Sequence, residues 1–540
     1  MFVFRGGKMV VVSWSRTARL LAAVSLTAAL GACAVRPEPA TSQDLKAQAI
    51  ADRAEMFRSG EPLDHPLGMN EAIARALKYN LEKRARMMEE ALALGQTDLS
   101  NWEMLPKLTA NAGYDERSRP QASRSRDLYT QATGTQVNPT YSSDRFVKTA
   151  DLTLSWNILD FGLSYYNARS NADRALIAGE RRRKAVNNLV SDVRSAFWRA
   201  AAYQVLGTEV ERSLTETQSA LQDAEQIERE NLKAPAESLK FQRALLETQR
   251  QMQAIRQDLS TARIELAALI NLPPGTSFTL EVPAQMTPPV WTMSPDRMEE
   301  IAFENNPDLL EHNYLARIAA DDAKKAILRL LPGISFSAGR NWDSNSFAVY
   351  NQWYDVGSKL SWNLMNLVSA PDALALAESN EDMVKARRLA ARMAVLAQVY
   401  ISQQQFHGAA LQYRQSERLS QIDQRLYQLS LDKEANNALG VQERGASHAS
   451  AIISELRRFQ SYAQVEQSYA KMQATLGQDL LPPGVQADSN LKALSQAVGQ
   501  GLSAWTDQGA GPATTAEDDR KARSYLLSLF QSHSGGEPAK

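Results

Sequence analysis

The sequence predicts an α+β fold in which pairs of amphipathic strands alternate with very long helices. Three observations support this prediction. The motif Leu-Ser-Trp-Asn ends an alternating run at residues 154–157 and again at residues 360–363. A long stretch of helix-forming residues follows each copy. Other landmarks recur at constant spacing, so the chain contains an internal two-fold repeat.

The first 32 residues have the features of a secretory signal peptide, starting at Met1 or Met9. Basic residues precede an apolar stretch at residues 20–30, which is too short to span a bilayer, and small residues follow it. Cys33, the sole cysteine, stands at the expected cleavage point. Residues 30–33 resemble the bacterial lipobox, in which the cysteine carries acyl chains such as palmitate. The alternative is a chance cysteine behind a plain signal cut after Ala32.

The next segments are a tether and the start of the first repeat. Residues 33–65 are rich in proline, alanine, glutamine and charge and predict a lipidated tether with one short helix near residues 47–57. The first repeat is expected at residues 66–297, where helical apolar spacing runs from Pro66 to Met104. The second is expected at residues 298–485, where Asn306-Pro307 is placed to begin a helix. Asn80 and Asn306 are separated by 226 positions, and so are Pro106 and Pro332.

Four runs alternate between apolar and polar residues, as half-buried strands do. The apolar positions are Leu108, Ala110, Ala112 and Tyr114; Leu152, Leu154 and Trp156; Ile334, Phe336 and Ala338; and Leu360, Trp362 and Leu364. For any single run the alternative is an ordinary soluble sheet with one polar face. Four strands cannot close a membrane barrel, which needs roughly eight or more, so lipid-facing strands would have to be pooled from several chains. The long connection at residues 115–145 is expected to be a solvated loop.

Helices follow each strand pair. No proline occurs between Gly162 and Pro235, which predicts a helix over residues 164–232, roughly 100 Å long, with a narrow apolar seam. Its repeat is expected at residues 372–438. Shorter return helices are expected at residues 236–270 and 447–476, and helices at 80–104 and 307–330 should stack on them end to end. Both returns end in Leu-Pro-Pro-Gly, 209 positions apart, and that offset places the second turn near Glu443-Arg444.

Composition excludes several classes of protein. The chain has 540 residues, 44% hydrophobic residues and a mean hydropathy of −0.38, which excludes a bundle of membrane-spanning helices. Net charge is −1, and the four basic residues near the N-terminus contribute +4, which leaves −5 for the remainder and no basic footprint for nucleic acid. The basic run at residues 181–184 is interpreted as a solvated helix face. Residues 486–540 predict a periplasmic, partly disordered tail with one short helix.

No catalytic or metal-binding pattern is present in the sequence. The histidines are scattered without the spacing of a metal site, and they are His65, His312, His407, His448 and His533. No phosphate-binding loop or nucleophile elbow occurs. We therefore expect no enzyme activity, no cofactor and no bound metal.

Two copies of strand, strand and long helical hairpin behind a signal resemble the TolC-type outer-membrane efflux factors, in particular the lipid-bearing OprM-like branch. The resemblance covers roughly residues 66–485. It rests on Pro66-Leu67 with Glu71-Ala72-Ile73, Ala76-Leu77 and Asn80, and on Trp156 followed by Asp160-Phe161-Gly162. The second transition, Asn366-Leu367-Val368, lacks the glycine of the first.

The resemblance implies a homotrimer, in which three chains build a twelve-stranded antiparallel transmembrane β-barrel continued by a coiled-coil barrel of long helices. It implies a passive export conduit in the cell outer membrane, lipid-anchored and extending into the periplasm, that works with a periplasmic adaptor protein and an inner-membrane transporter. The alternative that the residues leave open is a lipid-anchored periplasmic coiled-coil scaffold without a pore.

The expected site residues fall into three groups. Tyr114, Trp156 and Trp362 are expected at the interface with outer-membrane lipid. By position alone, the helical tips are expected to contact the adaptor, through Lys233, Ala234, Pro235, Gly440 and Val441. Asp432 and Glu434 near the second tip are candidates for a constriction that favours cations. The alternative for these two is that they are ordinary surface carboxylates.

Overall fold

The computed structural model describes residues 39–123, 139–230, 234–283, 285–435, 441–481 and 489–508. The predicted signal peptide, Cys33, Lys233 and Gly440 lie outside the described residues. The chain divides into two compact units, residues 1–59 and residues 60–540. The first contains α2 (Ser42–Met56), which begins five residues earlier than predicted because Thr41 and Asp44 form a capping box, and which buries none of its side chains.

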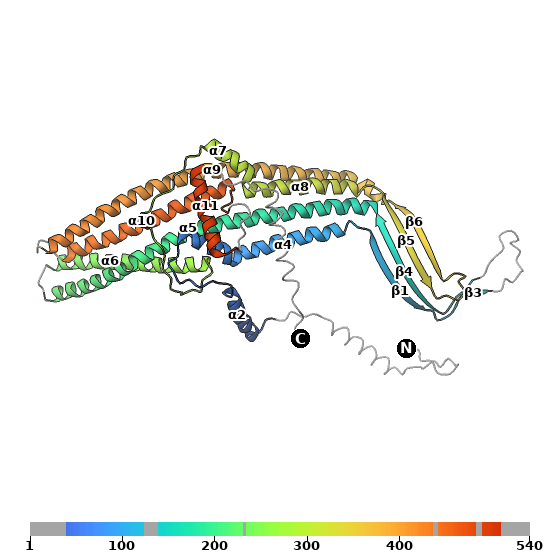
Figure 1. The fold of residues 1–540 in the computed structure, drawn as a ribbon, viewed down its shortest axis with the longest axis horizontal. Coiled ribbons are helices and arrows are strands. Elements are labelled where there is room, and N and C mark those ends of the chain that lie inside the picture. The colour runs from blue at the N-terminus through green and yellow to red at the C-terminus, as the bar shows by residue number, and fades with distance from the viewer. Residues whose placement is uncertain are drawn as a thin grey trace. The chain divides into compact units, whose positions relative to one another are not determined.

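A four-stranded antiparallel sheet lies in the second unit, with the strand order β1-β4-β5-β6 (Figure 1). The strands are β1 (Lys107–Glu116), β4 (Phe146–Asn157), β5 (Gly333–Asp343) and β6 (Gln352–Ser361). All four predicted strands are confirmed, and β4 pairs with β5, so the two repeats share one sheet. The predicted loop between β1 and β4 contains a short ladder of β2 (Gln121–Ser123) and β3 (Thr140–Ser143). Its residues 124–138 are outside the described part.

The prediction for the last strand was wrong at its end. β6 stops at Ser361, so Trp362 and Leu364 lie beyond the strand. Two local bonds explain this. The Trp362 indole N–H donates to the carbonyl oxygen of Leu330 at 2.9 Å, and the Asn363 side-chain oxygen accepts from the backbone N–H of Met365 at 3.1 Å. Asn363 thus satisfies an orphan donor at the start of the next helix.

Nine helices are described in the second unit. They are α3 (Met69–Tyr79), α4 (Leu81–Trp102), α5 (Ile158–Arg229), α6 (Pro235–Leu269), α7 (Pro295–Asn305), α8 (Pro307–Leu328), α9 (Met365–Ala435), α10 (Val441–Leu476) and α11 (Leu491–Gln508). The two long helices are confirmed at 72 and 71 residues. Both begin earlier than predicted, and Pro371 is accommodated within α9. None of the described helices combines the length and apolar character needed to cross a membrane.

The second helical turn is not where the repeat offset placed it. Glu443 and Arg444 lie inside α10, which begins at Val441. The first return helix begins at Pro235, and proline at the first helical position fixes that start. The second return has no proline there. The offset of 209 residues therefore does not carry over to the turn.

The short helices stack end to end, as predicted, through two equivalent asparagines. Asn80 and Asn306 have the same backbone angles, φ −63° and ψ 124°, and each caps the helix that follows it. The Asn80 amide donates to the Leu269 carbonyl at the end of α6 at 3.2 Å, and the Asn306 amide donates to the Thr475 carbonyl near the end of α10 at 2.8 Å. α4 thus continues α6, and α8 continues α10.

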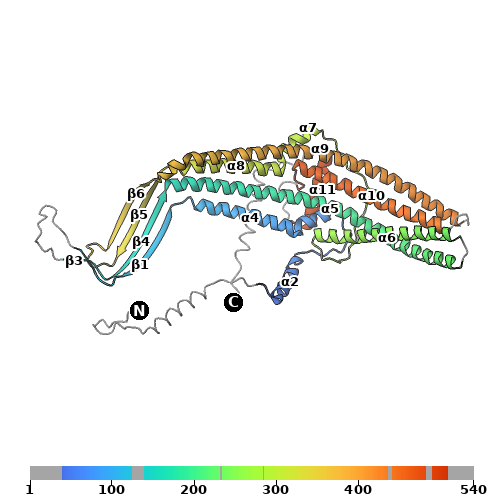
Figure 2. The same ribbon diagram turned by 180° about the vertical axis from the view of Figure 1, so that it is seen from behind.

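The helices form a row in the same order as the strands. α4 and α6 pack on one side of α5, α8 and α10 pack on its other side, and α9 follows them (Figures 1 and 2). β1, β4, β5 and β6 connect to α4, α5, α8 and α9 in turn. The row and the sheet therefore make one continuous wall, and each of its two sides ends in a free edge within the described chain.

A buried core lies where α3, α7 and α11 meet the row. Leu67 forms an isolated bridge with Leu280, and Ile73, Leu77 and Phe197 are buried beside it. α11 packs on α3 and buries Leu494 and Val498, so the tail helix belongs to this core. Gly501 approaches the Leu480 carbonyl so closely that a Cβ atom would stand 1.9 Å from it. Only glycine fits at this position.

Residues 60–65, expected within the tether, belong to the larger unit. The buried Arg75 guanidinium donates to the carbonyl oxygens of Glu61 and Pro62 at 2.9 and 3.3 Å and to the Glu71 carboxylate at 2.9 Å. The Glu61 carboxylate also accepts from Tyr79 at 2.7 Å. These bonds fix the chain against α3 from residue 61 onward.

Candidate functional site

The sheet has one apolar face whose rows continue across the strands. Leu108 pairs with Leu154, Leu154 with Ala338, and Ala338 with Val356. Along β4 the apolar face is the more exposed one: Leu152 is 48% and Leu154 44% exposed, whereas Thr153 and Ser155 between them are partly buried. A sheet on a soluble core buries its apolar face. A large apolar face open to the surroundings indicates an interaction surface.

The opposite face is polar and hydrogen-bonded from strand to strand. The Asn111 amide donates to the Asp151 carboxylate at 2.9 Å, and Thr153 donates to the same carboxylate at 3.2 Å. Asn341 donates to Asp355 in the same way across β5 and β6. These donors form hydrogen bonds to the carboxylates of the polar face. The face can therefore line an aqueous space with its charged groups hydrogen-bonded.

The three predicted aromatic residues lie at two levels of the sheet. Tyr114 is near the end of β1 away from the helices, and its ring stacks on Phe146 at 6.5 Å. Trp156 is at the helical end of β4, with its ring 5.8 Å from that of Phe161. Trp362 follows β6 at the same helical end. All three side chains are exposed. Their contact with lipid stays a prediction.

Asparagines cap the helices that follow β4 and β6. The Asn157 side-chain oxygen accepts from the backbone N–H groups of Leu159 and Asp160 at 2.9 and 3.3 Å, and Asn363 performs the same role before α9. The last residue of the repeated Leu-Ser-Trp-Asn motif is therefore a helix cap. This is the physical reason for its repetition at both junctions.

Both edges of the helical row expose apolar side chains. Those on α9 include Leu389, Met393, Leu411, Leu419, Ile422, Leu426 and Leu429, and those on α4 and α6 include Leu92, Leu99, Trp102, Leu239 and Leu246. β1 and β6 likewise have a partner on one side only among the described strands. Unpaired strand edges and apolar helix faces favour association with further chains.

The helical tips are described in part. Ala234 is the residue before α6 and Pro235 is its first residue, and both are exposed. Val441 is the first residue of α10, and its side chain is not described. Asp432 is exposed near the end of α9, and Glu434 lies in the same helix with its side chain outside the described set. The roles of these residues as tip contacts and gate stay predictions.

The basic run at residues 181–184 is solvent-exposed, as predicted, at Arg181 and Lys184, but Arg182 and Arg183 are partly buried and all four residues form ion pairs. Arg181 pairs with Glu311 at 2.7 Å, Arg182 with Glu90 at 2.5 Å and Lys184 with Asp308 at 2.7 Å, while Arg183 reaches Asp479 at 3.1 Å. These carboxylates come from α4, α8 and the segment after α10. Because α5 has neighbouring segments on both sides, basic side chains that point in different directions from it can each pair with a carboxylate.

Two further sets of charges hold α5 to the second repeat. The buried Arg194 guanidinium pairs with Glu466 of α10 at 2.5 Å and donates to Gln473 at 3.1 Å. Asp173 pairs with Arg317 of α8 at 2.5 Å, and Arg169 pairs with Asp321 at 3.1 Å, so the two helices exchange reciprocal ion pairs. Burial raises the pKa of Asp173 above its ordinary value, and the nearby Asp321 carboxylate adds to this.

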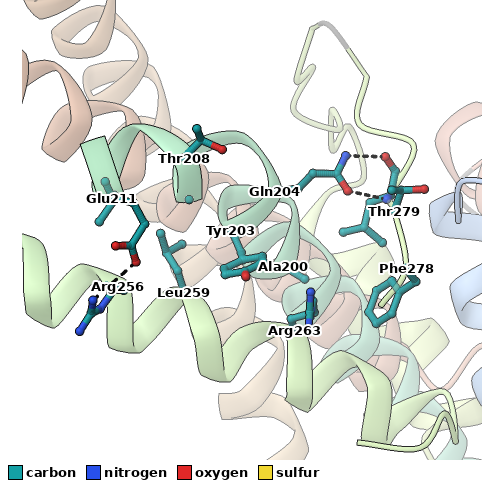
Figure 3. A pocket seen from close by; sticks show the side chains of 13 residues that line it. Ala200, Tyr203, Gln204, Thr208, Glu211, Arg256, Leu259, Arg263, Phe278 and Thr279 are labelled. Carbon is teal, nitrogen blue, oxygen red and sulfur yellow. Dashed lines mark hydrogen bonds and ion pairs between the residues drawn. The ribbon is translucent and has the colours of Figure 1, made fainter. Parts of the chain in front are cut away.

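Sequence reasoning missed a cavity of about 490 Å³ between α5, α6 and residues 278–280 (Figure 3). Gln204 holds that segment in place, donating to the Leu280 carbonyl at 2.9 Å and accepting from the Leu280 N–H at 2.6 Å. The Arg263 guanidinium lies 5.3 Å from the Tyr203 ring centre, and Arg256 pairs with Glu211 at 3.6 Å. The lining residues come from three separate segments, so no local sequence pattern predicts the cavity.

No group of three or more histidine, cysteine or acidic residues among the described positions could hold a metal ion. His448 is buried between Glu209 at 3.2 Å and Glu216 at 3.4 Å, and its ring stacks on Tyr427 at 4.6 Å. This histidine joins α10 to α5 and α9, a role that its position in the sequence did not indicate.

We compared the chain with known proteins by sequence and by structure. No protein-family model and no curated protein sequence matches the chain. Among solved structures, the CmeC outer membrane channel of Campylobacter jejuni matches with a TM-score of 0.60 and 12% identity, over 86% of this chain and 98% of CmeC. CusC, whose structures describe transmembrane channel formation, matches with a TM-score of 0.57 and 17% identity over 76% and 92%.

A third match is the open state of the MtrE outer membrane channel of Neisseria gonorrhoeae. It has a TM-score of 0.55 and 16% identity, over 76% of this chain and 88% of MtrE. At these identities the similarity establishes the fold. The chain has the α+β fold of these channels, with a long helical part and a small antiparallel sheet.

Proposed function

We propose that the chain is one subunit of an outer-membrane channel, a passive export conduit across the outer membrane and the periplasm. The observation that carries this proposal is the exposed apolar face, which stays in register across all four strands. The strands have 10, 12, 11 and 10 residues. A tilted strand needs about 9–11 residues to cross the hydrocarbon layer.

The subunit would function as a homotrimer. A sheet in lipid must close because an open edge leaves backbone groups unpaired, and four strands are too few to close. We propose that β6 of one copy pairs with β1 of the next, and that α9 packs against α4 and α6 of that neighbour. Three copies then contribute twelve strands. The exposed apolar side chains on both edges of the row support such a head-to-tail ring.

The remaining assignments follow from the resemblance to TolC-type factors. Acyl chains on Cys33 would anchor each subunit in the outer membrane, and Tyr114, Trp156 and Trp362 would meet lipid at its two interfaces. A periplasmic adaptor protein and an inner-membrane transporter would dock at the helical tips, on Lys233, Ala234, Pro235, Gly440 and Val441. The transporter would select the exported substrate, and the conduit itself would perform no bond chemistry.

Planar-bilayer conductance of the purified full chain tests the proposal. We expect trimers in detergent and discrete single-channel currents. Leu154→Asp puts a charge on the apolar face and should abolish insertion, because a charge facing lipid is costly. The matched control is Thr153→Asp on the polar face, which should still conduct. A monomeric wild-type protein without currents would favour the scaffold alternative.

The candidate gate has its own test within this proposal. If Asp432 and Glu434 line a constriction, replacing both by alanine should raise conductance or weaken the preference for cations, because fixed carboxylates attract them. Single-channel currents in salt gradients measure both properties. Unchanged channels would remove the two residues from the gate.

A further inference from the structure

The two hairpins place a cation opposite a tyrosine at the same level of the sheet. In the first, Tyr114 of β1 pairs with Lys148 of β4. In the second, Arg340 of β5 pairs with Tyr354 of β6. Each pair lies seven steps from the first pair of its ladder at the helical end. Tyr114 and Arg340 are equivalent by the offset of 226, so the repeats keep the combination and exchange the strands that carry it.

Both pairs lie on the apolar face. Tyr114 shares its face with Leu108, and Arg340 shares its face with Phe336. All four side chains are exposed, with Tyr114 59% and Tyr354 76% exposed. The Arg340 guanidinium lies 5.7 Å from the centre of the Tyr354 ring. The tyrosine thereby orients the cation at the surface instead of burying it.

Neither cation of these two pairs has an ion-pair partner among the described residues. Arg340 reaches a neutral partner, the Gln352 amide oxygen, at 3.4 Å. One carboxylate, Glu116, occurs on the same face, opposite Phe146. The other two lysines of the sheet, Lys107 and Lys359, point to the polar face. The two cation–tyrosine pairs thus present positive charge outward from the apolar band.

Their level suits a lipid headgroup. A cation is costly at the centre of the hydrocarbon layer and tolerated at its interface. Tyrosine and tryptophan concentrate at that interface, and Trp342 lies two residues beyond Arg340 on the same face. Arginine binds phosphate with paired hydrogen bonds, lysine binds it as a point charge, and a tyrosine hydroxyl can donate a further bond.

We propose that Lys148 with Tyr114 and Arg340 with Tyr354 are two binding sites for the phosphate groups of lipid headgroups in the outer leaflet. The outer leaflet is the one at this level because the helices leave the opposite end of the sheet. The inference rests on the proposed function, since it requires the apolar face to contact a bilayer. A trimer would carry six such sites around its circumference.

Lipid binding to the full-length channel in nanodiscs tests these sites. The probe is lipid A in a phosphatidylcholine background, and the readouts are lipid retained per channel by native mass spectrometry and a titrated Kd. Each surface cation contributes about a fivefold increase in affinity. We therefore expect Lys148→Gln with Arg340→Gln to weaken lipid A binding about fivefold at each site. Dephosphorylated lipid A should bind weakly, and its Kd should be the same for the wild-type protein and the variant.

The matched control is Lys107→Gln with Lys359→Gln, which removes the same charge from the polar face and should leave binding unchanged. Conductance of the Lys148 and Arg340 variant checks that it still folds and inserts. Equal binding by wild type and this variant, in channels that conduct, would overturn the lipid sites and leave the conduit standing. Equal loss in the control would also overturn them, because net charge alone would then explain the binding. A wild-type chain that does not enter bilayers would overturn both proposals.

Discussion

Helices α5 and α9 are repeat-related and almost equal in length, but they are packed differently. Residues separated by 209 positions form a common seam that is buried in both helices, at Val190 and Val399, Phe197 and Phe406, and Ala200 and Ala409. The remaining faces diverge. Val210 is fully buried in α5, whereas its equivalent Leu419 is 52% exposed in α9.

The difference follows from position in the row. α5 has α4 and α6 on one side and α8 and α10 on the other, and its cations at residues 181–184 pair with carboxylates around it. α9 contacts α8, α10 and the short helix α7, and within the described chain the face that carries its exposed leucines has no neighbour. An exposed row of leucines on a helix indicates an interaction surface for a further chain.

The largest expected loss of stability comes from substitutions in the seam that α5 and α9 share. Phe197→Ala and Phe406→Ala should each lower the free energy of unfolding by about 3–5 kcal/mol, because each leaves a cavity at a buried aromatic position. Urea denaturation followed by circular dichroism measures the loss. A loss confined to the α5 variant would show that the seam is not equivalent in the two helices.

The equivalent positions Val210 in α5 and Leu419 in α9 should respond differently to the same substitution. Val210→Ser should cost about 2–4 kcal/mol in stability, since it removes a buried apolar side chain and inserts a hydroxyl. Leu419→Ser should leave the unfolding of the isolated subunit within about 0.5 kcal/mol of wild type. The proposed trimer of the Leu419 variant should dissociate at lower detergent concentration, measured by light scattering. Retention of wild-type association would mean that this side of α9 is not an interface.

The helix caps predict a smaller difference between the repeats. Asn157 accepts two backbone hydrogen bonds and Asn363 accepts one. Asn157→Ala should therefore cost more than Asn363→Ala, within the range of about 0.5–2 kcal/mol that caps contribute. Thermal melting of the two variants side by side tests the order. Serine at either position serves as the control, because it can cap as well.

The smallest expected effect is a pH dependence specific to α5. The buried Asp173 faces Arg317, Arg169 and Asp321, and burial raises its pKa above 3.8. A raised folded-state pKa means that the protonated carboxyl favours folding, and this contribution is lost as pH rises through the folded-state pKa. Lowering the pH from about 7 towards 4 should therefore stabilise wild type relative to Asp173→Asn. A difference that stays constant with pH would contradict this assignment.

Elements that depend on local patterns were predictable. Alternation located the four strands, the absence of proline located the long helices, and Asn306-Pro307 located the start of α8. Helix and strand ends were less accurate where a single hydrogen bond decided them, as at Trp362 and Asn363. The start of α10 could not be transferred from the first repeat, because Pro235 has no counterpart there.

Candidate sites divide in the same way. The apolar strand face followed from side-chain period alone. The cavity beside Tyr203 and the buried Arg194–Glu466 pair each require segments that are far apart in the sequence. The cation–tyrosine pairs required the strand register, which shows that Tyr114 faces Lys148 and Arg340 faces Tyr354.

The sequence by itself determined the periods, lengths and caps of the elements and their two-fold repetition, because each of these is a property of neighbouring residues. Only the tertiary structure decided that β4 joins β5 into one sheet, that the helices line up in the same order, and that one side of the row is left open. These features depend on which elements lie side by side, and the free energy of that choice comes from contacts between distant residues.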